Sequence, residues 1–575
     1  MHASVPAARP PANATAAARP FIAFALLALA LYSLLAHWEQ HGAEAPKFST
    51  DGSQVAFEIN MAASKAQEAV VTGTGEVDIA TGSSGSKYNS AKHPRRVVAH
   101  FMLGNTYPFT ESDWARTLHY AEKTSLDALV LNLGPEEWQL EQARVAYKLA
   151  ETRIDKAGRH ERPVRLFLSL DMNVLPHKTL EDAHKLAMHI APLISSHAAL
   201  RRGHHPILST FGGEDAEWGK NGWPGFIAEV NRLVRAQIFF WPGFFVSPEE
   251  FKNNPLVGGS FVWNSAWPDG NHPIRHHHDA PFLDIGKPYM AAISPLFFTH
   301  YGKTGQFAFD KNWIYRSDDL LYPARWGGIM EYKKEKAPEM VQVISWNDYG
   351  ESHNIGPVMG AEPGSTAWTH RMNHDAFREM TGYYARRWRD GTPHVNDEFI
   401  VWMWYRTHSK NVVVKHDPVG RPQNADWAQD YVNVVVICPK GIESPRLEFH
   451  NGPDSKTGVH RDIPIASGDA TQTLFEFVPG HVHFTLKSKA GVHINGTGHE
   501  ILPNHRVMLY NFNMWSGQWL AASTTVLDPP AKPEDTPAPE THIVVGGHPT
   551  DNVDEGSAGK EGSTHGHRPY MGPPS

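Results

Sequence analysis

The sequence predicts an α/β protein, a (β/α)8 TIM-type barrel followed by a C-terminal antiparallel β-sandwich. Two observations predict this fold. Between residues 97 and 346, eight short apolar runs alternate with amphipathic helical patterns, which is typical of parallel βα units. After about residue 395, apolar and polar residues alternate between Gly, Pro, Asp and Asn, which is typical of short antiparallel strands. An open, doubly wound parallel sheet is the alternative for the first part, because long insertions follow the sixth and seventh runs.

The eight apolar runs are the predicted barrel strands. Nearly every position in them is apolar, as expected of strands that are buried on both faces. They are VVAHFML from Val97, ALVLNL from Ala128, VRLFLSL from Val164, PILST from Pro206, QIFFW from Gln237, GSFVWN from Gly259, YMAAIS from Tyr289 and VQVISW from Val341.

Helical patterns separate several of these runs. The first helix is predicted to start with a capping box made by Thr110 and Asp113. A second is predicted over residues 135–156, and the last, around FREMTGYYARRWRDG, closes this part near Gly391. Two more are indicated by apolar residues that share one helical face, which are Leu180, Ala183, Leu186, Ala187 and Ile190, and then Phe226, Val230 and Leu233.

The amino-terminal segment indicates a membrane protein. Residues 1–20 carry Arg9 and Arg19 and no acidic residue, and 18 mostly apolar residues follow at 21–38. That length just spans a bilayer, and basic residues on its amino side keep that end cytoplasmic. We therefore expect a single-pass, type II membrane protein whose remaining chain is extracellular or lumenal. Secretion after cleavage near AEA (residues 43–45) is the alternative.

The chain is expected to have six parts. The first part of the body is rich in Gly, Ser and Ala and the tail is rich in Pro and Gly, so both are predicted to lack a packed core. The β-sandwich has six predicted strands, EFIVWMWYRTH, NVVVKH, YVNVVVICP, RLEFHN, HVHFTLKS and RVMLYNF. The parts are a short cytoplasmic segment (1–20), a signal anchor (21–38), a flexible stalk (39–94), the barrel (95–394), the β-sandwich (395–527) and a disordered tail (528–575).

Composition excludes several classes of function. The 575 residues have a formal net charge of -8 with Lys and Arg scattered, so no basic surface for nucleic acid is expected. Cys438 is the only cysteine, which excludes an internal disulfide, and Asn495 begins an N-G-T glycosylation triplet. A phosphate-binding loop followed by Lys and a G-x-S-x-G motif are both missing, so nucleotide binding and a serine nucleophile lose support. We expect a monomer without a cofactor.

In a barrel of this kind, the residues that carry chemistry stand where the strands run into the loops at their carboxyl ends. The predicted strand ends carry acids, amides and aromatic rings, and flat apolar faces with a polar edge suit sugar rings. These residues are His100, Asn105, Asn132, Asp171, Glu214, Asp215, Trp241, Trp263, Asn264, Asp348 and Glu351.

Asp348 and Glu351 stand three positions apart in VISWNDYGESHN, at the end of the eighth run. Hydrolysis of a glycosidic bond needs one carboxyl group that protonates the leaving oxygen and a second that activates water or attacks the sugar. Crowding raises the pKa of at least one carboxyl group, which can keep it protonated as a general acid. The simpler alternative is that Asp348 caps the following loop while Glu351 is solvated.

Three consecutive histidines, residues 276–278, precede Asp279 and raise the question of a metal site. Consecutive histidines on a regular element cannot all face one ion, and the familiar zinc spacings are missing. We therefore predict a solvated loop here and no metal site.

Five segments become recognisable when they are taken together and in order. VVAHFMLGNTYPFTESDWARTLHYAEKTSLDALVLNLG, LFLSLDMN, LSTFGGED, GSFVWNSAWP and VISWNDYGESHNIGP resemble segments of the fungal α-1,3-glucanases, or mutanases, of glycoside hydrolase family 71. The resemblance covers about residues 95–390 and continues more loosely into the β-rich part. It implies a (β/α)8 barrel with a β-sandwich behind it, and endo-acting hydrolysis of α-1,3-glucan, a fungal cell-wall polymer, with inversion at the anomeric carbon.

The resemblance also implies roles for individual residues. Asp348 and Glu351 match the family's acidic pair, and Asp171 matches a further acid that holds the sugar or orients the pair. A glucan-binding protein without turnover, or a hydrolase of a different glycan such as an α-mannan, remains open. Further matches, as sugar contacts, are His100, Asn105, Asn132, Glu214, Asp215, Trp263, Asn264, Trp346, Asn347 and His353.

Overall fold

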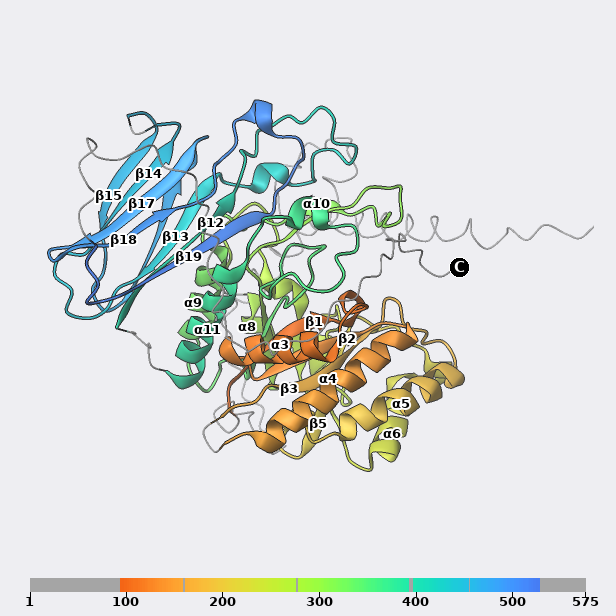
Figure 1. Cartoon of the computed structure of the whole chain (residues 1–575). Coiled ribbons are helices and arrows are strands. Elements are labelled where there is room, and N and C mark those ends of the chain that lie inside the picture. The colour runs from red at the N-terminus through yellow and green to blue at the C-terminus, as the bar shows by residue number, and fades with distance from the viewer. Residues whose placement is uncertain (1–93, 159–160, 276–277, 392–396, 455, 528–575) are drawn as a thin grey trace, which may run out of the picture. The chain divides into compact units, whose positions relative to one another are not determined.

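The computed structural model describes residues 94–527, apart from 159–160, 276–277, 392–396 and 455. Within them the chain has a mixed α/β fold, in which one large, mainly parallel sheet with helices is followed by antiparallel sheets (Figure 1). The predicted cytoplasmic segment, signal anchor and tail lie outside the described residues, as does the predicted stalk up to residue 93.

The predicted membrane-anchored localisation is contradicted. Among the helices of the described residues, none is long and apolar enough to cross a membrane. The apolar segment 21–38, on which that prediction rested, lies outside the described residues.

All eight predicted apolar runs contain a strand of the large sheet, and these eight strands pair with one another in parallel. The order across the sheet is β6-β5-β3-β2-β1-β11-β8-β7, and the short β4 (Arg201–Arg202) pairs antiparallel with β5. The strands are β1 (Arg96–Met102), β2 (Ala128–Leu133), β3 (Arg165–Asp171), β5 (His205–Phe211), β6 (Phe239–Phe240), β7 (Ser260–Val262), β8 (Tyr289–Ile293) and β11 (Met340–Val343).

The first and last runs of the sequence are neighbours in this sheet, because β1 pairs with β11. The two ends of the strand order also approach each other. Gly258, just before β7, donates its backbone N–H to the carbonyl of Phe240 in β6 at 2.8 Å. The sheet is therefore strongly curled.

Helices connect successive strands. The predicted capping box is confirmed, because Thr110 Oγ1 accepts from Asp113 N (3.3 Å) while Asp113 Oδ2 accepts from Thr110 N (2.9 Å). The last helix ends at Gly391, whose φ of 73° is left-handed and favours glycine. The α-helices are α3 (Glu111–Lys123), α4 (Glu137–Lys156), α5 (Leu180–Ser195), α6 (Gly222–Val234), α7 (Pro248–Asn253), α8 (Ala280–Leu283), α9 (Leu321–Glu331), α10 (Thr366–Thr369) and α11 (Asp375–Asp390).

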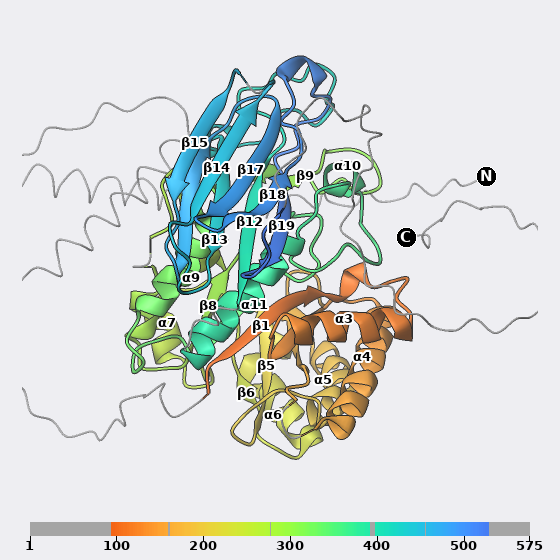
Figure 2. The ribbon, with the colours of Figure 1, turned by 60° about the vertical axis from the view of Figure 1, so that its left-hand side comes forward.

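Short 3-10 turns complete this list, at η2 (Leu103–Asn105), η3 (Trp218–Lys220), η4 (Trp263–Ala266), η6 (Ala425–Trp427) and η7 (Asn504–Arg506). Helices α3, α4, α5 and α6 lie side by side along the sheet (Figures 1 and 2). Each buries one apolar face, as Trp114, Leu118 and Ala121 of α3 do. Of the predicted face of α6, Phe226 and Val230 are buried, whereas Leu233 is only partly buried.

The insertion after the seventh run forms a hairpin. Its strands β9 (Phe298–His300) and β10 (Asn312–Ile314) pair antiparallel. The hairpin also meets the C-terminal part, since Ile314 N donates to Gln423 O (3.2 Å) and Gln423 N donates to Asn312 O (2.9 Å).

The C-terminal part contains two four-stranded antiparallel sheets. Their buried side chains form one apolar cluster, to which Phe399 and Val401 contribute from one sheet and Phe449 and Phe484 from the other. The first sheet has the order β16 (Ala470–Glu476), β13 (Tyr431–Ile437), β12 (Glu398–Arg406) and β19 (Met514–Ala522); the second has β15 (Val459–Pro464), β14 (Arg446–Gly452), β17 (His481–Ser488) and β18 (Gly491–Thr497).

Two of the six predicted C-terminal strands are wrong. NVVVKH (411–416) and RVMLYNF (506–512) lie outside every strand. Their buried residues pack instead into a separate cluster with the hairpin, in which Val412 and Phe512 join Phe298. The alternation that suggested strands therefore reflects docking of loops onto that cluster.

Arg406, the last residue of β12, joins the two parts of the chain. Its guanidinium lies 2.7 Å from Asp318 Oδ2 and 2.5 Å from Asp430 Oδ1. Asp318 precedes α9, and it and Arg406 are almost fully buried, at 1% and 2% exposed. Asp318 also accepts a hydrogen bond from Gln429 N (2.9 Å). The buried carboxylate of Asp318 thus depends on Arg406 for its neutralising positive charge.

We expect Arg406→Met to destabilise the protein by about 3–5 kcal/mol, because it leaves the Asp318 carboxylate buried without a cation. Urea unfolding followed by tryptophan fluorescence measures this loss. Arg446→Met is the control, since Arg446 pairs with Asp462 (2.7 Å) at the surface, where such pairs contribute at most about 1 kcal/mol. Equal losses of unfolding free energy in the two variants would contradict the conclusion that the buried ion pair of Arg406 stabilises the junction.

Candidate active site

The chain turns back on itself after β11, and Ser345 organises that turn. Ser345 Oγ accepts a hydrogen bond from Asp348 N (2.9 Å) and is bonded to His353 Nδ1 (3.0 Å). The backbone N–H of Ser345 donates to the carbonyl of His353, and that of Ile355 donates to the carbonyl of Ser345, each at 2.9 Å. The loop that carries Asp348 and Glu351 is therefore held by its own hydrogen bonds.

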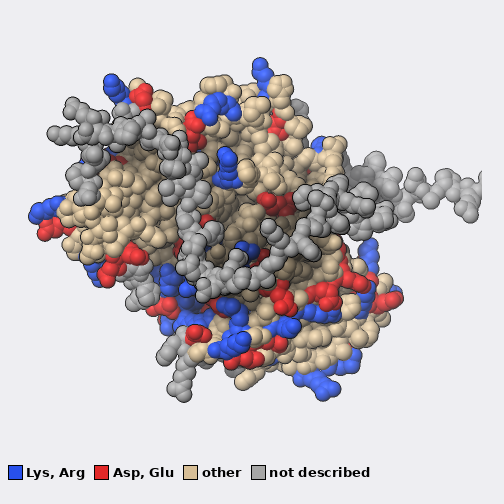
Figure 3. Space-filling model, viewed as in Figure 1, with Lys and Arg blue, Asp and Glu red and all other residues tan. Residues whose placement is uncertain are grey.

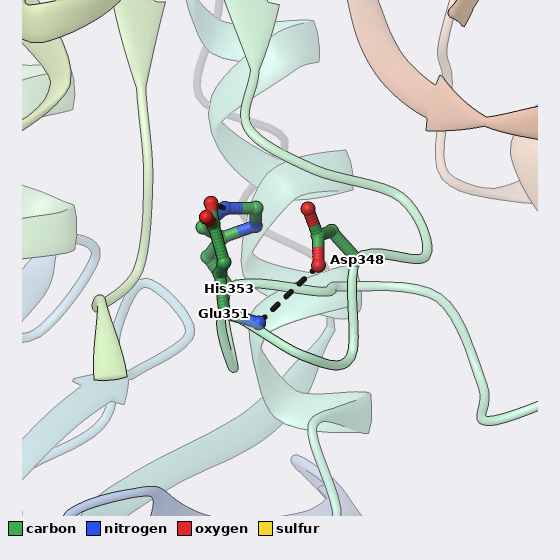
Figure 4. A group of neighbouring side chains, drawn as sticks. All are labelled: Asp348, Glu351 and His353. Atoms are coloured by element: carbon green, nitrogen blue, oxygen red, sulfur yellow. Dashed lines mark hydrogen bonds and ion pairs between the residues drawn. The ribbon is translucent and has the colours of Figure 1, made fainter. Parts of the chain in front are cut away.

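The side chains of Asp348 and Glu351 lie next to each other in this loop (Figure 4). Glu351 N donates to Asp348 Oδ1 at 3.2 Å, so Asp348 does help to cap the loop, as the simpler alternative proposed. One carboxyl oxygen of each residue lies within 4.8 Å of the other. The Glu351 side chain keeps 20% of its surface exposed, so solvent reaches the pair.

The two carboxyl groups have unequal partners. His353 Nε2 is 3.0 Å from Glu351 Oε2, and Lys311 Nζ is 3.5 Å from Glu351 Oε1. Asp348 has neither a cation nor a side-chain donor at hydrogen-bond distance among the described residues. Glu351 is therefore the better stabilised of the two as an anion.

The pKa values follow from these partners. Burial, and then the charge of Glu351, raise the pKa of Asp348 to about 6. Burial also pushes the pKa of Glu351 upward, but the hydrogen bond and charge of His353, together with Lys311, outweigh burial and lower it. At mildly acidic pH, Asp348 thus carries a proton while Glu351 is ionised.

Asp171 ends β3 and is held by a residue of β2. Asn132 Nδ2 donates to Asp171 Oδ2 at 2.9 Å. Burial raises the pKa of Asp171, although the Asn132 hydrogen bond and the charge of Lys311 oppose the shift. Because Lys311 acts electrostatically on Asp171 as well as on Glu351, the third acid belongs to the same electrostatic site.

His100, near the end of β1, is buried beneath the site. Gln342 Nε2 donates to its Nδ1 at 3.2 Å, and its ring meets the edge of Trp263 at a centroid distance of 4.8 Å. Burial, and then the charge of His353, lower the pKa of His100 to about 3, so the ring is neutral. Trp263, which follows β7, is half-buried and presents an aromatic ring beside this histidine.

Three residues that were predicted to contact sugar form hydrogen bonds that link β1 and the residues after it to the segment that follows β11. Asn347 brackets the backbone of Met102, accepting from its N–H (2.7 Å) and donating to its carbonyl (3.0 Å). Asn105 Nδ2 donates to Asn347 O (2.8 Å), and Trp346 N donates to His100 O (2.7 Å). These contacts give Asn105, Trp346 and Asn347 a structural role, and their contact with sugar stays a prediction.

Three other predicted contacts are exposed. Glu214 Oε2 accepts from Phe245 N at 3.3 Å, Asp215 lies in an exposed turn, and Asn264 is an exposed residue of η4. In the part of the chain that the structure describes, no contact joins these residues to Asp348 or Glu351. Trp241, also predicted at a strand end, is fully buried and donates its Nε1–H to Ser260 O.

Several residues at the site carry no signal in the sequence. Lys311 comes from the β9–β10 hairpin, and Tyr301 follows β9, which was not predicted as a strand. Tyr301 donates its hydroxyl to Pro363 O (2.7 Å), and burial together with the charges of Asp348 and Glu351 raises its pKa. These residues follow no motif, because only the folded hairpin brings them to the loop after β11.

The spacing of Asp348, Glu351 and His353 raises the question of a metal ion, since one potential ligand atom of each lies within 4.8 Å of the others. Both ring nitrogens of His353 already have partners, Glu351 and Ser345. We therefore describe the three residues as a hydrogen-bonded cluster, and the absence of a metal stays a prediction.

The histidine-rich loop before α8 has a structural residue at its end. Asp279 is fully buried and forms an ion pair with Arg325, whose Nη2 donates to Asp279 Oδ1 at 2.8 Å. Tyr289 also donates its hydroxyl to Asp279 (2.5 Å). Asp279 therefore serves the core, and residues 276–277 lie outside the described residues.

A large concavity lies away from the acids. It has a volume of about 760 Å³ at the amino ends of the strands, and Arg95, Asp127, Arg165 and Arg389 are among its lining residues. On the face drawn in Figure 3, basic and acidic side chains are mixed over the helical part of the molecule. None of the predicted site residues lines this concavity.

Comparison with known proteins shows which family the chain resembles. The model of glycosyl hydrolase family 71 matches residues 93–528. The chain is 28% identical to the glucan endo-1,3-alpha-glucosidase agn1 of Schizosaccharomyces pombe over 452 residues, which cover 75% of this chain and 96% of that protein. It is 27% identical to the ascus wall endo-1,3-alpha-glucanase of the same organism, with 73% and 96% covered. It is 28% identical to a mutanase of Penicillium rubens, with 75% and 90% covered.

The family match extends across both the large sheet and the antiparallel sheets, and it includes the loop that carries the acidic pair. The chain described here is thus a glycoside hydrolase and belongs to glycosyl hydrolase family 71.

Proposed function

We propose that this enzyme hydrolyses internal bonds of α-1,3-linked glucan. The names of the three relatives support the substrate, since each is called an α-1,3-glucanase, an α-1,3-glucosidase or a mutanase. The observation that carries the reaction is the unequal pair Asp348 and Glu351, one favoured as the acid and the other as the anion.

In this proposal Asp348 is the general acid. Its raised pKa keeps a proton available for the leaving glycosidic oxygen, and its partial exposure lets a sugar reach it. Glu351 is the ionised partner, which either takes a proton from the attacking water or itself attacks the anomeric carbon, while the leaving oxygen takes the proton of Asp348. His353 and Ser345 hold Glu351 and Asp348 at their relative positions.

Asp171 and its neighbours are proposed to hold the sugar. Asn132 Oδ1 is buried and lacks a hydrogen-bond partner among the described residues, so it can accept from a sugar hydroxyl. The ring of Trp263 offers an apolar face of the kind on which a pyranose packs. Glu214, Asp215 and Asn264 remain proposed contacts with more distant sugars of the glucan chain, and His100 remains a proposed contact beside the acidic pair.

We also infer that the large sheet closes into a (β/α)8 barrel over about residues 95–394, and that the antiparallel sheets form a β-sandwich over 395–527. Eight parallel strands in sequential order and the Gly258–Phe240 hydrogen bond between the two ends support closure. The apolar cluster shared by the two antiparallel sheets supports the sandwich.

Inversion at the anomeric carbon stays a prediction. An inverting enzyme keeps its two carboxyl groups roughly 6.5–9.5 Å apart to admit a water molecule. The nearest oxygens of Asp348 and Glu351 lie within 4.8 Å. Inversion predicts that the two carboxyl groups stand at the larger separation, with a water molecule between Glu351 and the sugar, when substrate is bound.

The proposed substrate is tested by incubating the purified protein with insoluble α-1,3-glucan, α-mannan and β-1,3-glucan, and by measuring the reducing ends released. We expect release from α-1,3-glucan as a series of oligosaccharides, because internal cutting yields several lengths. Binding without release would indicate a glucan-binding protein. Faster release from α-mannan would indicate a hydrolase of another glycan.

We expect Asp348→Asn and Glu351→Gln each to lower kcat on α-1,3-glucan by a factor on the order of a hundred or more, since a positioned acid or base typically contributes that much. Glu249→Gln is the matched control, because Glu249 lies on α7 with 67% of its side chain exposed. Circular dichroism checks that all variants fold. Full turnover in either site variant would remove that residue from the mechanism.

The rate is expected to be highest at mildly acidic pH. Asp348 must be protonated and its pKa is raised to about 6, so kcat should fall as pH rises through about 6. Glu351 must be ionised and its pKa lies below the ordinary 4.5, so kcat should fall only when pH drops below that range. A pH–rate profile between pH 3 and 8 measures both limbs, and an optimum above pH 8 would contradict the assignment of Asp348 as the acid.

A further inference from the structure

Lys311 brings a positive charge to the acidic pair from outside the strands of the large sheet. Its Nζ lies 3.5 Å from Glu351 Oε1, and its side chain is 47% exposed. The residue stands just before β10, where Tyr301 N donates to its carbonyl (2.7 Å) and its own N–H donates to Tyr301 O (3.1 Å). The ammonium group therefore reaches Glu351 from the edge of the site, on a backbone that the hairpin fixes.

The C-terminal part holds this hairpin in place. Asn312, next to Lys311, accepts at its carbonyl from Gln423 N (2.9 Å), and its Oδ1 is bonded to His300 Nδ1 (2.8 Å). His300 in turn pairs with Asp417 at 3.0 Å, and both side chains are buried. The position of Lys311 is thus set by contacts that the C-terminal part makes.

Charged and titratable groups from several elements face Glu351. Burial lowers the pKa of His100 and raises the pKa values of Tyr301 and Tyr315, so these three side chains are neutral at the working pH. Lys311 thus brings a positive charge to Glu351, and His353 contacts the other carboxylate oxygen at 3.0 Å. The groups that face Glu351 are Asp348 and His353 of its own loop, His100 of β1, and Tyr301, Lys311 and Tyr315 in and around the hairpin.

We propose that Lys311 is a positioning residue for hydrolysis, which holds the Glu351 carboxylate in orientation and keeps it ionised beside a protonated Asp348. The inference rests on the function proposed above for this pair. His353 binds Glu351 Oε2 while Lys311 contacts Oε1, so the two cover both oxygens and fix the plane of the carboxylate. Because the Lys311 side chain is partly exposed, it can also contact a bound glucan chain while it pairs with Glu351.

The test compares Lys311→Met with Lys311→Arg and with Lys303→Met. Lys303 is a matched control, because it lies in the loop between the same two hairpin strands with 81% of its side chain exposed, and Asp310, at 3.9 Å, is its one ion-pair partner among the described residues. An opposite charge within about 4–6 Å lowers a carboxyl pKa by about 1–3 units, and screening reduces this at an exposed lysine. We expect the acidic limb of the kcat profile to move up by about half a pH unit or more in Lys311→Met, a loss of about threefold on that limb.

In Lys311→Arg the acidic limb of the kcat profile should stay at the wild-type pH, because arginine keeps the positive charge. Lys303→Met should give the same profile as the wild type. A lower kcat in Lys311→Met with an unmoved limb would show a merely structural role and overturn the inference. Titration of the Glu351 carboxyl by ¹³C NMR, with its signal assigned by Glu351→Gln, gives a readout that needs no substrate. If the wild type cleaves no glycan, the proposed function fails, and a Glu351 pKa that is unchanged in Lys311→Met would separately overturn this inference.

Discussion

Parallel pairing of the strands is the constraint on which the site depends. Because β1, β2, β3 and β11 run in the same direction, their carboxyl ends meet at one edge of the sheet. Residues 177 to 180 positions apart in the sequence are therefore brought into one electrostatic site, with Asp171 at the end of β3 and Asp348 and Glu351 after β11. The amino ends of the same strands carry the large arginine-lined concavity and none of these acids. Strand direction thus places the acids and this concavity at opposite ends of the strands.

Two carboxyl groups this close oppose each other's ionisation, and the surroundings resolve the conflict through unequal partners. Glu351 receives His353 on one oxygen and Lys311 near the other, while Asp348 receives a backbone N–H and burial. The difference between the acid and the anion therefore comes from the neighbours and not from the side chains themselves. Ser345 contributes indirectly, because its hydroxyl links the backbone of Asp348 to the ring of His353.

The sequence predicted what depends on strong, local patterns. Eight runs that are apolar at nearly every position became eight strands, because strands buried on both faces need such residues. The acidic pair was predicted from its spacing at a strand end. By contrast, β15 was missed, since Val459–Pro464 is largely exposed and shows no apolar alternation, and 506–512 was assigned as a strand although its apolar residues dock on the hairpin. The contact of Lys311 with Glu351 could not be predicted, because a single lysine in a loop follows no sequence motif and only the folded hairpin brings it to Glu351.

The hydrogen bonds between the β9–β10 hairpin and the loop around Asp417 and Gln423 have a consequence for how this enzyme can evolve or be engineered. A sugar-binding module that hangs on a flexible linker can be exchanged for another without disturbing its catalytic neighbour. Here the loop between β12 and β13 supplies part of the scaffold that brings the Lys311 cation to the Glu351 carboxylate. In a chimera with the C-terminal sheets of another protein, the β9–β10 hairpin would be displaced unless the loop around Asp417 and Gln423 were kept. The catalytic part and the C-terminal part are therefore expected to evolve together.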